Sequence, residues 1–364
     1  MNKNQFSISA LARLMVDTVA ATARMTCRKD TVRQWPRMFH EGIDPLVHLF
    51  LQANNTALID QWLDRGTKVV FLSSFPRSGN TWMRYLLSDV LLQMHGLKTT
   101  TRLPIHPDNL MPEFGTNCIA RRIRRCPTLD LMGPPAAFIK SHFPFERHVD
   151  IFAREKDKHP RDCRILYLFR TPEDALVSFF HMCERQPWAR GKTTQGLDAF
   201  CRVEAANWVK NVSSYFKAAD EGYPVFFLSY EKLLENPALV LENILRWLEI
   251  KHDDQMVPRA VSNMKFIKLQ AMEMQESQFD FNSNERNLFF RRGCSGSGRT
   301  ELPDSTLQEI HKLTGAIFDQ ANQRQASQPA NHPASPGPDS RTPARSCENS
   351  ASWNGHSTGS DLAA

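Results

Sequence analysis

Residues 69–94 read VVFLSSFPRSGNTWMRYLLSDVLLQM, and this stretch decides the fold class. It begins with four apolar residues, continues through a short polar loop, and ends in a segment whose apolar side chains recur at helical spacing. A strand, a tight turn and a helix in that order direct several backbone N–H groups and the positive end of the helix dipole at one point, which makes a binding site for an anion. Gly79 lets the backbone approach a phosphate closely, and Arg77 adds a permanent positive charge.

The loop differs from that of an ordinary P-loop kinase. A Walker A loop reads G-x-x-x-x-G-K-[ST], and here both the upstream glycine and the lysine are missing. A kinase with a related phosphate cradle remains one alternative, and a strand-to-helix turn without any ligand is another. Taken alone, the loop predicts an anion cradle and no particular reaction.

Three further apolar runs follow, at residues 136–139, 165–169 and 225–228. Uniformly apolar strands separated by helical stretches are typical of a parallel sheet that is covered on both faces. We therefore predict an α/β fold, a P-loop-like three-layer α/β/α domain with a central, mainly parallel sheet. The intervening helices are predicted over 81–94, over 197–216, and from Asn236-Pro237 onward.

The chain divides into three predicted zones. Residues 1–66 form a helical N-terminal extension, whose apolar stripe either packs on its own domain or lies on a membrane or a partner. Residues 67–322 form the α/β domain. Residues 323–364 are rich in Ser, Pro, Asn and Gly, so they cannot bury enough apolar surface to offset the entropy of ordering, and we expect a disordered tail.

Bulk composition restricts the location of the protein more than its activity. The net charge of +6 suits a protein that binds anionic nucleotides, but it is also common elsewhere. There is no run of about 18 uncharged apolar residues and no signal-peptide pattern, so we expect no transmembrane segment and a cytoplasmic location. None of the eight cysteines forms a C-x-x-C pair, and we expect free thiols.

Residues 75–82, FPRSGNTW, closely resemble the 5′-phosphosulfate loop of the cytosolic-type sulfotransferases, whose usual form is Y-P-K-S-G-T-T-W. Arg77 replaces the family lysine and Asn80 replaces a threonine. Arg77 keeps the positive charge but cannot donate a proton as lysine does. The resemblance implies that this loop binds the donor nucleotide through Arg77, Ser78, Gly79, Asn80, Thr81 and Trp82.

A second motif, FIKSHFP at residues 138–144, is similar to the family strand end K-T-H-x-P. The resemblance implies that His142 is the general base and that Lys140 stabilises the transferring sulfuryl group. A lone histidine is more often structural. That alternative weakens at the carboxyl end of a strand, where open α/β sheets bind ligands.

Two more motifs resemble the binding segments for the 3′-phosphate of the donor. YLFRTPEDALVSF at residues 167–179 implies that Arg170 and Ser178 bind this phosphate, although an ordinary strand-to-helix junction is the alternative. FRRGCSG at residues 290–296 is similar to R-K-G-x-x-G, and Gly298 stands where the family has tryptophan. The residues that this second motif assigns to the 3′-phosphate are Arg291, Arg292 and Gly293.

Two positions have weaker matches. The strand end FLSYE at residues 227–231 is similar to the family's F-Y-E and places Tyr230 near the nucleotide. Phe266 is matched to the aromatic residue that flanks the adenine.

The resemblance, which covers most of the predicted domain, implies a sulfotransferase that uses 3′-phosphoadenosine 5′-phosphosulfate (PAPS). The sulfuryl group would pass by in-line displacement to a hydroxyl or amine, with His142 as the base and Lys140 and Arg77 neutralising charge, and no metal is expected. The alternatives are a P-loop-type nucleotide kinase and an inactive nucleotide-binding protein. We expect no nucleic-acid partner, and the oligomeric state stays open.

The acceptor is a small molecule or a glycan on this interpretation. The arginine cluster at residues 121–125 either attracts an anionic acceptor or forms a solvated helix face. Aromatic residues that fall where family substrate sites lie favour an apolar or phenolic acceptor instead. These residues are Phe143, Phe145, Phe179, Phe180 and His181.

Overall fold

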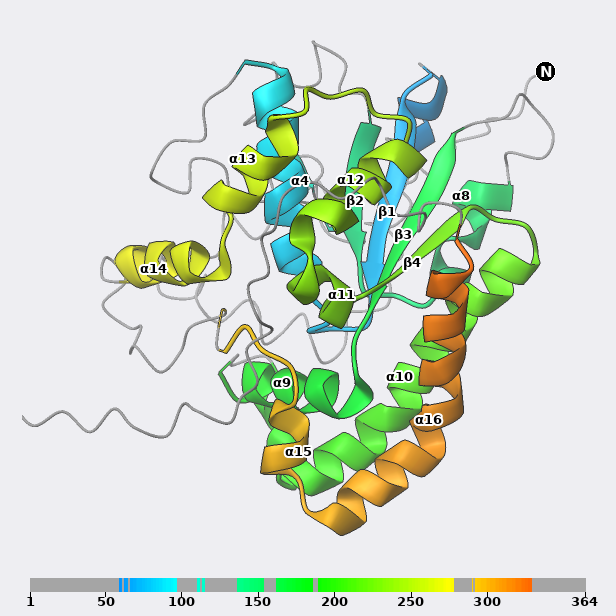
Figure 1. Cartoon of the computed structure of the whole chain (residues 1–364). Coiled ribbons are helices and arrows are strands. Elements are labelled where there is room, and N and C mark those ends of the chain that lie inside the picture. Colours follow the sequence, from blue (N-terminus) through cyan, green and yellow to red (C-terminus); the bar gives the residue numbers. More distant parts are fainter. Residues whose placement is uncertain are drawn as a thin grey trace, which may run out of the picture.

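The computed structural model describes residues 59–60, 62–64, 66–96, 110–111, 113–114, 136–153, 162–185, 189–277, 290 and 292–328. Within these residues one sheet contains the strands β1 (Lys68–Ser74), β2 (Ala136–Ser141), β3 (Cys163–Phe169) and β4 (Val225–Ser229) (Figure 1). All of the pairings are parallel, and the strand order is β2-β1-β3-β4. The predicted parallel sheet is confirmed, and each strand contains its predicted apolar run.

Helices cover both faces of the sheet because successive side chains of a strand point to opposite sides. Val69 and Phe71 of β1 belong to one buried cluster, whereas Val70 and Leu72 belong to another. The predicted three-layer architecture is therefore confirmed. The first face packs against α8 (Val149–Ala153), α10 (Leu197–Asp220) and α16 (Asp304–Ala326), and the second against α4 (Asn80–Met94), α12 (Pro237–Trp247) and α13 (Met256–Asn263).

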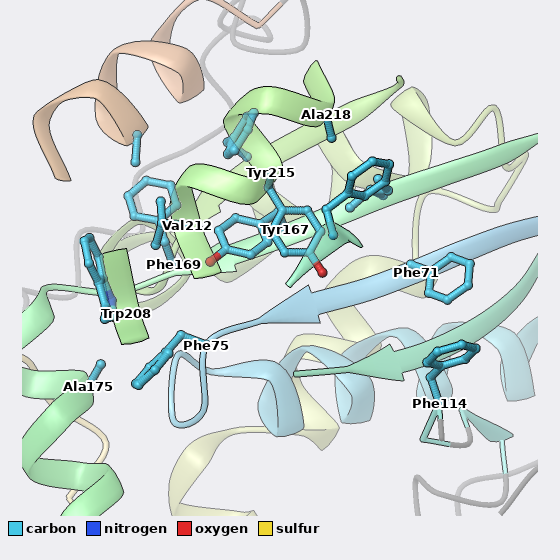
Figure 2. Close-up of a cluster of buried hydrophobic side chains, with 14 of the residues drawn as sticks. Phe71, Phe75, Phe114, Tyr167, Phe169, Ala175, Trp208, Val212, Tyr215 and Ala218 are labelled. Carbon is cyan, nitrogen blue, oxygen red and sulfur yellow. The ribbon is translucent and has the colours of Figure 1, made fainter. Parts of the chain in front are cut away.

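Aromatic side chains fix α10 against the middle of the sheet (Figure 2). The rings of Tyr167 on β3 and Tyr215 on α10 stack with centroids 4.2 Å apart, and Trp208, earlier on the same helix, is fully buried in the same cluster. Burying a large apolar side chain stabilises a fold by about 1.5–3 kcal/mol, so this contact fixes the rotation of α10 about its axis. The same helix then presents Asn211 to the sheet edge.

The helix boundaries follow local signals. The Asn236 side chain accepts a hydrogen bond from the backbone N–H of Leu239 at 3.0 Å, and Pro237 is the first residue of α12, as predicted. The helix predicted over 197–216 runs on to Asp220 as α10, which packs along α16. The remaining elements are α9 (Pro172–Arg185), α11 (Tyr230–Glu235), α14 (Phe266–Ser277), α15 (Ser297–Glu301) and the 3-10 turns Phe145–Arg147 and Arg190–Thr193.

The carboxyl ends of the strands meet at one edge. The register pairs Ser73 with Ser141 across β1 and β2, and Ser74 with Leu168 across β1 and β3. The chain passes from β1 to β2 on one side and then to β3 on the other, which makes this edge a topological switch point, the place where open α/β sheets bind ligands. The motifs that include the ends of β1, β2, β3 and β4 therefore meet at this edge.

Several predictions lie outside the described residues: most of the N-terminal extension, the arginine cluster at 121–125, Arg291, and the tail from residue 329. Ile59, Trp62 and Leu63, which were assigned to the extension, are buried in the first core cluster. The last helix ends at Ala326. In the part of the chain that is described, no helix has the length and apolar character needed to cross a membrane.

The cysteines show one difference from prediction. Cys163, Cys183 and Cys201 are buried thiols, and burial raises the pKa of Cys183 to about 11 and that of Cys201 to about 12. Cys294, however, is disulfide-bonded, so the expectation of free thiols is wrong for this residue. Spacing along the chain did not reveal it, because a disulfide depends on which cysteines the fold brings together.

Candidate active site

The 75–82 loop is a tight turn between β1 and α4. Arg77 and Gly79 both have left-handed backbone angles, with φ of 68° and 93°. A β-carbon on Gly79 would lie only 2.6 Å from the Tyr230 ring, so the loop lies directly against that ring. The start of α4 has no side-chain cap, and the buried Ser78 hydroxyl has no hydrogen-bond partner among the described residues. These donors fit an anion such as a phosphate or sulfate ester.

The remaining side chains of the loop point in different directions. The indole N–H of Trp82 donates to the carbonyl oxygen of Met264 at 2.9 Å, and the ring lies edge-on to Tyr230. Thr81 is half-buried in the first turn of α4. Asn80 is buried and its amide contacts the end of β1 instead of the loop.

Arg77 joins the first loop to the predicted 3′-phosphate segment. Its Nε donates to the hydroxyl of Ser178 on α9 at 3.1 Å. Its carbonyl oxygen accepts a hydrogen bond from Arg170, at an N–O distance of 3.4 Å. The structure thus brings together three residues that the resemblance assigned to opposite ends of one nucleotide.

Arg170 is a buried cation at the end of β3. Its guanidinium lies over the Tyr230 ring at 4.4 Å, and it donates to the carbonyl oxygen of Cys294 at 2.9 Å. The Asp174 carboxylate lies 3.4 Å from it. The Nε of Arg170 is buried without a partner among the described residues, so one donor remains for a ligand.

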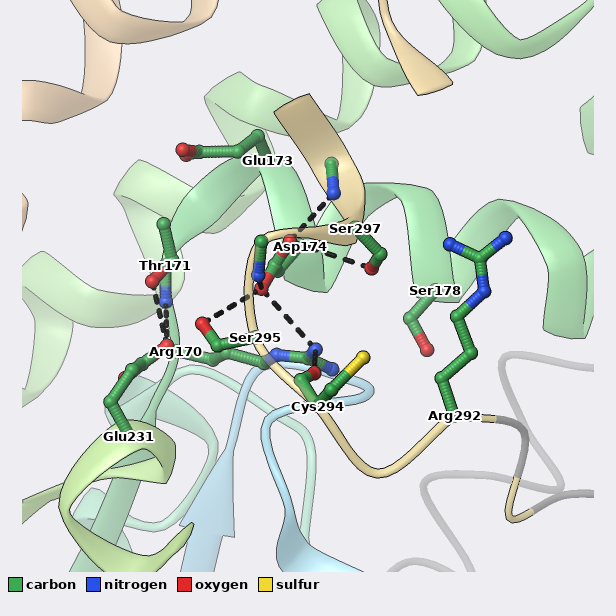
Figure 3. A network of polar contacts seen from close by, with 12 residues as sticks. Arg170, Thr171, Glu173, Asp174, Ser178, Glu231, Arg292, Cys294, Ser295 and Ser297 are labelled. Carbon is green, nitrogen blue, oxygen red and sulfur yellow. Dashed lines mark hydrogen bonds and ion pairs between the residues drawn. The ribbon is translucent and has the colours of Figure 1, made fainter. Parts of the chain in front are cut away.

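Asp174 fixes the loop 292–298 against the start of α9 (Figure 3). Its fully buried carboxylate accepts hydrogen bonds from the backbone N–H groups of Gly298 at 2.6 Å and Gly296 at 2.7 Å, and from the Ser295 hydroxyl at 3.1 Å. A β-carbon on Gly298 would lie 2.5 Å from the carbonyl carbon of Glu173. This close approach explains the glycine at the position where the family has tryptophan.

Gly293 and Phe266, both predicted near the nucleotide, are in contact. Gly293 has a φ of 61°, and a β-carbon there would lie 2.5 Å from the Phe266 ring. Arg292, in contrast, is paired with Glu301, at an N–O distance of 2.9 Å. The other carboxylate oxygen of Glu301 lies 2.6 Å from Nε2 of His181. The guanidinium of Arg292 therefore has a protein carboxylate as its partner.

His142 follows β2 at the same edge. Its Nδ1 lies 2.9 Å from the carbonyl oxygen of Ser74 and 3.2 Å from the Ser74 hydroxyl. A carbonyl oxygen only accepts, so Nδ1 bears the proton and Nε2 bears the lone pair. Burial lowers the pKa of His142 well below its ordinary value of 6.5, and the positive charge of Lys140 lowers it further. The neutral imidazole can therefore accept a proton at Nε2 near pH 7.

The backbone around His142 is fixed from α10. The Asn211 side chain donates to the carbonyl oxygen of His142 at 3.1 Å and accepts from the Tyr167 hydroxyl at 2.8 Å. The Tyr215 hydroxyl donates to the carbonyl oxygen of Phe143 at 2.8 Å. Sequence reasoning missed these residues, because nothing in the local pattern of α10 indicates which side chains meet β2.

Lys140 has a partner that the sequence did not suggest. Its ammonium lies 3.2 Å from the carboxylate of Glu113, and both side chains are largely buried. The backbone N–H of Phe114 also donates to the carbonyl oxygen of Lys140 at 2.8 Å. Glu113 therefore fixes the position of Lys140. The described residues contain no group of three or more potential metal ligands, and whether the site uses a metal stays a prediction.

Comparisons with known proteins agree with this arrangement. A family model described as the sulfotransferase domain matches residues 67–323. The chain is 27% identical to sulfotransferase 1B1 of Canis lupus familiaris over 252 residues, which are 66% of this chain and 78% of that protein. It is 22% identical to flavonol 3-sulfotransferase of Flaveria bidentis over 260 residues, 67% of this chain and 80% of that one. The crystal structure of mouse sulfotransferase SULT7A1 complexed with PAP superposes with a TM-score of 0.50 at 18% identity, covering 74% of this chain and 93% of that chain, which is a likeness of fold.

Proposed function

The chain belongs to the sulfotransferase domain family, and from that premise we propose that it transfers the sulfuryl group of PAPS to the hydroxyl or amine of a small molecule. One observation carries the proposal. A neutral imidazole, His142, lies at the same sheet edge as the loop whose buried Ser78 hydroxyl has no partner among the described residues. A base beside an anion cradle suits transfer of an anionic group to an acceptor that must lose a proton.

The donor would be bound at both of its ends. Its phosphosulfate fits the loop, where the Ser78 hydroxyl and the first N–H groups of α4 are available. Its 3′-phosphate fits the free Nε of Arg170 and the hydroxyl of Ser178. The ring of Phe266, in contact with Gly293, offers a flat apolar surface for the adenine.

When bound, PAPS supplies the sulfuryl group, whose bond to the 5′-phosphate oxygen breaks as a bond from sulfur to the acceptor forms. His142 accepts the acceptor proton at Nε2, while Nδ1–H keeps its bond to the carbonyl oxygen of Ser74. Lys140, at the end of β2, places a positive charge beside the reacting atoms. A well-placed general base accelerates such a step by about 10²–10⁴.

The acceptor that we propose is apolar or phenolic. Phe145, Phe179 and Phe180 are buried in the first core cluster, on the side of the sheet that includes α10. Phe143 is packed against that cluster directly after His142. Aromatic side chains in this part of the core would favour a ring or a short apolar chain over a charged glycan.

Release of 3′,5′-bisphosphoadenosine (PAP) from PAPS tests the proposal. We expect the wild-type chain to release it with at least one of four probes, namely a simple phenol, an aliphatic alcohol, an aryl amine and an acidic oligosaccharide. In His142→Gln we expect turnover to fall by about 10²-fold or more while the Kd for PAP changes by less than about threefold. The control Asn236→Ala removes the cap of α12, which lies outside the proposed site, so turnover and the Kd for PAP should match wild type even though stability falls.

The alternatives predict different outcomes. A kinase would consume ATP with Mg²⁺ and leave PAPS intact. An inactive nucleotide-binding protein would bind PAP but would not convert PAPS to PAP with any of the probes. If His142→Gln turned over at the wild-type rate, His142 would not be the general base, whereas the family membership of the chain would still hold.

A further inference from the structure

The side chain of Asn80 is turned away from the anion-binding loop. Its Nδ2 donates to the carbonyl oxygen of Leu72 at 2.9 Å and to the hydroxyl oxygen of Ser74 at 3.2 Å. Because the Leu72 carbonyl oxygen can only accept, Nδ2 and not Oδ1 must face it, which fixes the orientation of the amide. The residue is 3% exposed, so water does not compete for these bonds.

This orientation leaves Asn80 without a side-chain donor for an anion. The two contacts use both hydrogens of Nδ2, and Oδ1 is buried without a partner in the part of the chain that the structure describes. An amide oxygen accepts hydrogen bonds and repels the oxygens of a phosphate or sulfate. A threonine, the usual residue at this position in the resembling loop, would offer a hydroxyl donor. The asparagine side chain therefore has no hydrogen left to donate to an anion as that hydroxyl would.

Ser74 connects Asn80 to His142. The Ser74 hydroxyl oxygen lies 3.2 Å from Nδ2 of Asn80 and 3.2 Å from Nδ1 of His142. The Ser74 carbonyl oxygen, 2.9 Å from the same Nδ1, can only accept a hydrogen bond, so it favours a proton on that nitrogen. A hydroxyl oxygen has two lone pairs, so one can accept from Asn80 while the other faces Nδ1–H.

We propose that Asn80 is a positioning residue, which through Ser74 keeps His142 in the tautomer with its proton on Nδ1. The proposal rests on the proposed function, in which Nε2 of His142 takes the acceptor proton. Without the amide, the Ser74 hydroxyl can rotate and donate its own proton to Nδ1. That bond stabilises the tautomer with its proton on Nε2, which cannot accept another proton there. The expected loss is in turnover and not in donor binding.

The test compares Asn80→Ala and Asn80→Ser with wild type and with Asn236→Ala, an asparagine at the start of another helix. Three quantities are measured: the ¹⁵N shifts of the His142 imidazole in protein with labelled histidine, the Kd for PAP, and kcat with the probe acceptor that turns over fastest. We expect the fraction of His142 protonated at Nε2 to rise in both Asn80 variants. We also expect kcat to fall roughly 10- to 100-fold, with the Kd for PAP within about twofold of wild type.

The outcomes separate this proposal from the proposed function. The tautomer and the Kd are measured without turnover, so Asn80 can be tested even if no probe reacts. A weaker Kd for PAP with an unchanged tautomer would make Asn80 a donor ligand and overturn the proposal. Unchanged ¹⁵N shifts in a folded Asn80→Ser variant would also overturn it, and this variant replaces Asn80→Ala if the alanine protein does not fold.

Discussion

The Nε of Arg77 donates a hydrogen bond to the hydroxyl of Ser178 at 3.1 Å, which joins the loop after β1 to α9. The two residues are 101 positions apart in the chain, and the resemblance assigned them to the 5′ and 3′ ends of the donor. Arg77 also has a left-handed φ of 68°, which a residue with a side chain rarely adopts. The bond and the backbone angle together direct the guanidinium at the predicted 3′-phosphate site.

Arg77→Lys tests this connection. Lysine keeps the positive charge but lacks the planar guanidinium that reaches Ser178, so we expect the Kd for PAP to rise about tenfold. Ser178→Ala should then weaken binding less in the Arg77→Lys background than in wild type, because the two side chains act together. Isothermal titration of the four proteins measures this, with Arg190→Lys on an exposed turn as the control. Fully additive losses would contradict the coupling.

The rate should depend on pH in a direction that the environment of His142 fixes. Burial and the charge of Lys140 lower the pKa of His142 well below 6.5. The base is active when neutral, so kcat/KM should rise with pH through that lowered pKa and show no acid limb near 6.5. Arg84 also lowers the pKa, so Arg84→Met should move the acid limb upward. A wild-type limb centred at 6.5 or above would contradict the assignment.

Gly79→Ala should disrupt the loop. Its β-carbon would lie 2.6 Å from the Tyr230 ring, and its φ of 93° disfavours a side chain. We expect at least about tenfold weaker PAP binding and a stability loss of about 1–3 kcal/mol. Denaturant unfolding and PAP titration measure the two effects. Gly191→Ala is the matched control, because the β-carbon that alanine adds there would meet nothing within 4 Å and the φ of Gly191 is not in the left-handed region.

Asp174→Asn should loosen the loop 292–298. Gly296 and Gly298 donate their backbone N–H groups to different oxygens of the carboxylate, so the amide would keep one acceptor and place an NH₂ donor against the other N–H group. We expect the Kd to rise about tenfold or more for PAP but by a smaller factor for 5′-AMP, since we propose that the loop lies on the 3′ side of the donor. Glu173→Gln, which removes a partly exposed ion pair with Arg299, is the neighbouring control. Equal losses for the two nucleotides would contradict a role on the 3′ side.

His148 should make the fold sensitive to acid. Burial lowers its pKa from 6.5 to about 3, and Nε2 lies 2.9 Å from the Ser141 hydroxyl. The unfolded chain binds a proton below pH 6.5 whereas the folded chain does not, so this stabilisation is complete above pH 6.5 and is lost as the pH falls from 6.5 toward 3. The expected slope approaches about 1.4 kcal/mol per pH unit. Denaturant unfolding at several pH values measures the slope, and His148→Gln should show a shallower one.

Local pattern was sufficient for the fold class. The apolar runs predicted all of the described strands, and the start of α12 at Asn236-Pro237 was found from capping alone. Strand ends were predicted too short, because polar residues such as Ser73 and Ser141 continue β1 and β2 when the neighbouring strand pairs with them. Such pairing depends on the assembled sheet, so the apolar run alone does not predict where the strand ends.

The sequence by itself determined the order of strand, loop and helix, and the residues that follow each strand, because backbone angles and burial patterns depend on near neighbours along the chain. Only the tertiary structure decided which of those residues contact each other. Asp174 meets Gly298, which lies 124 positions away, and Asn211 meets His142 across 69 positions. It also decided that the Asn80 side chain contacts the strand end beside His142, whereas the loop pattern had placed it with the donor ligands. A hydrogen bond between distant residues depends on how helices pack on the sheet, and that packing is fixed by the whole core.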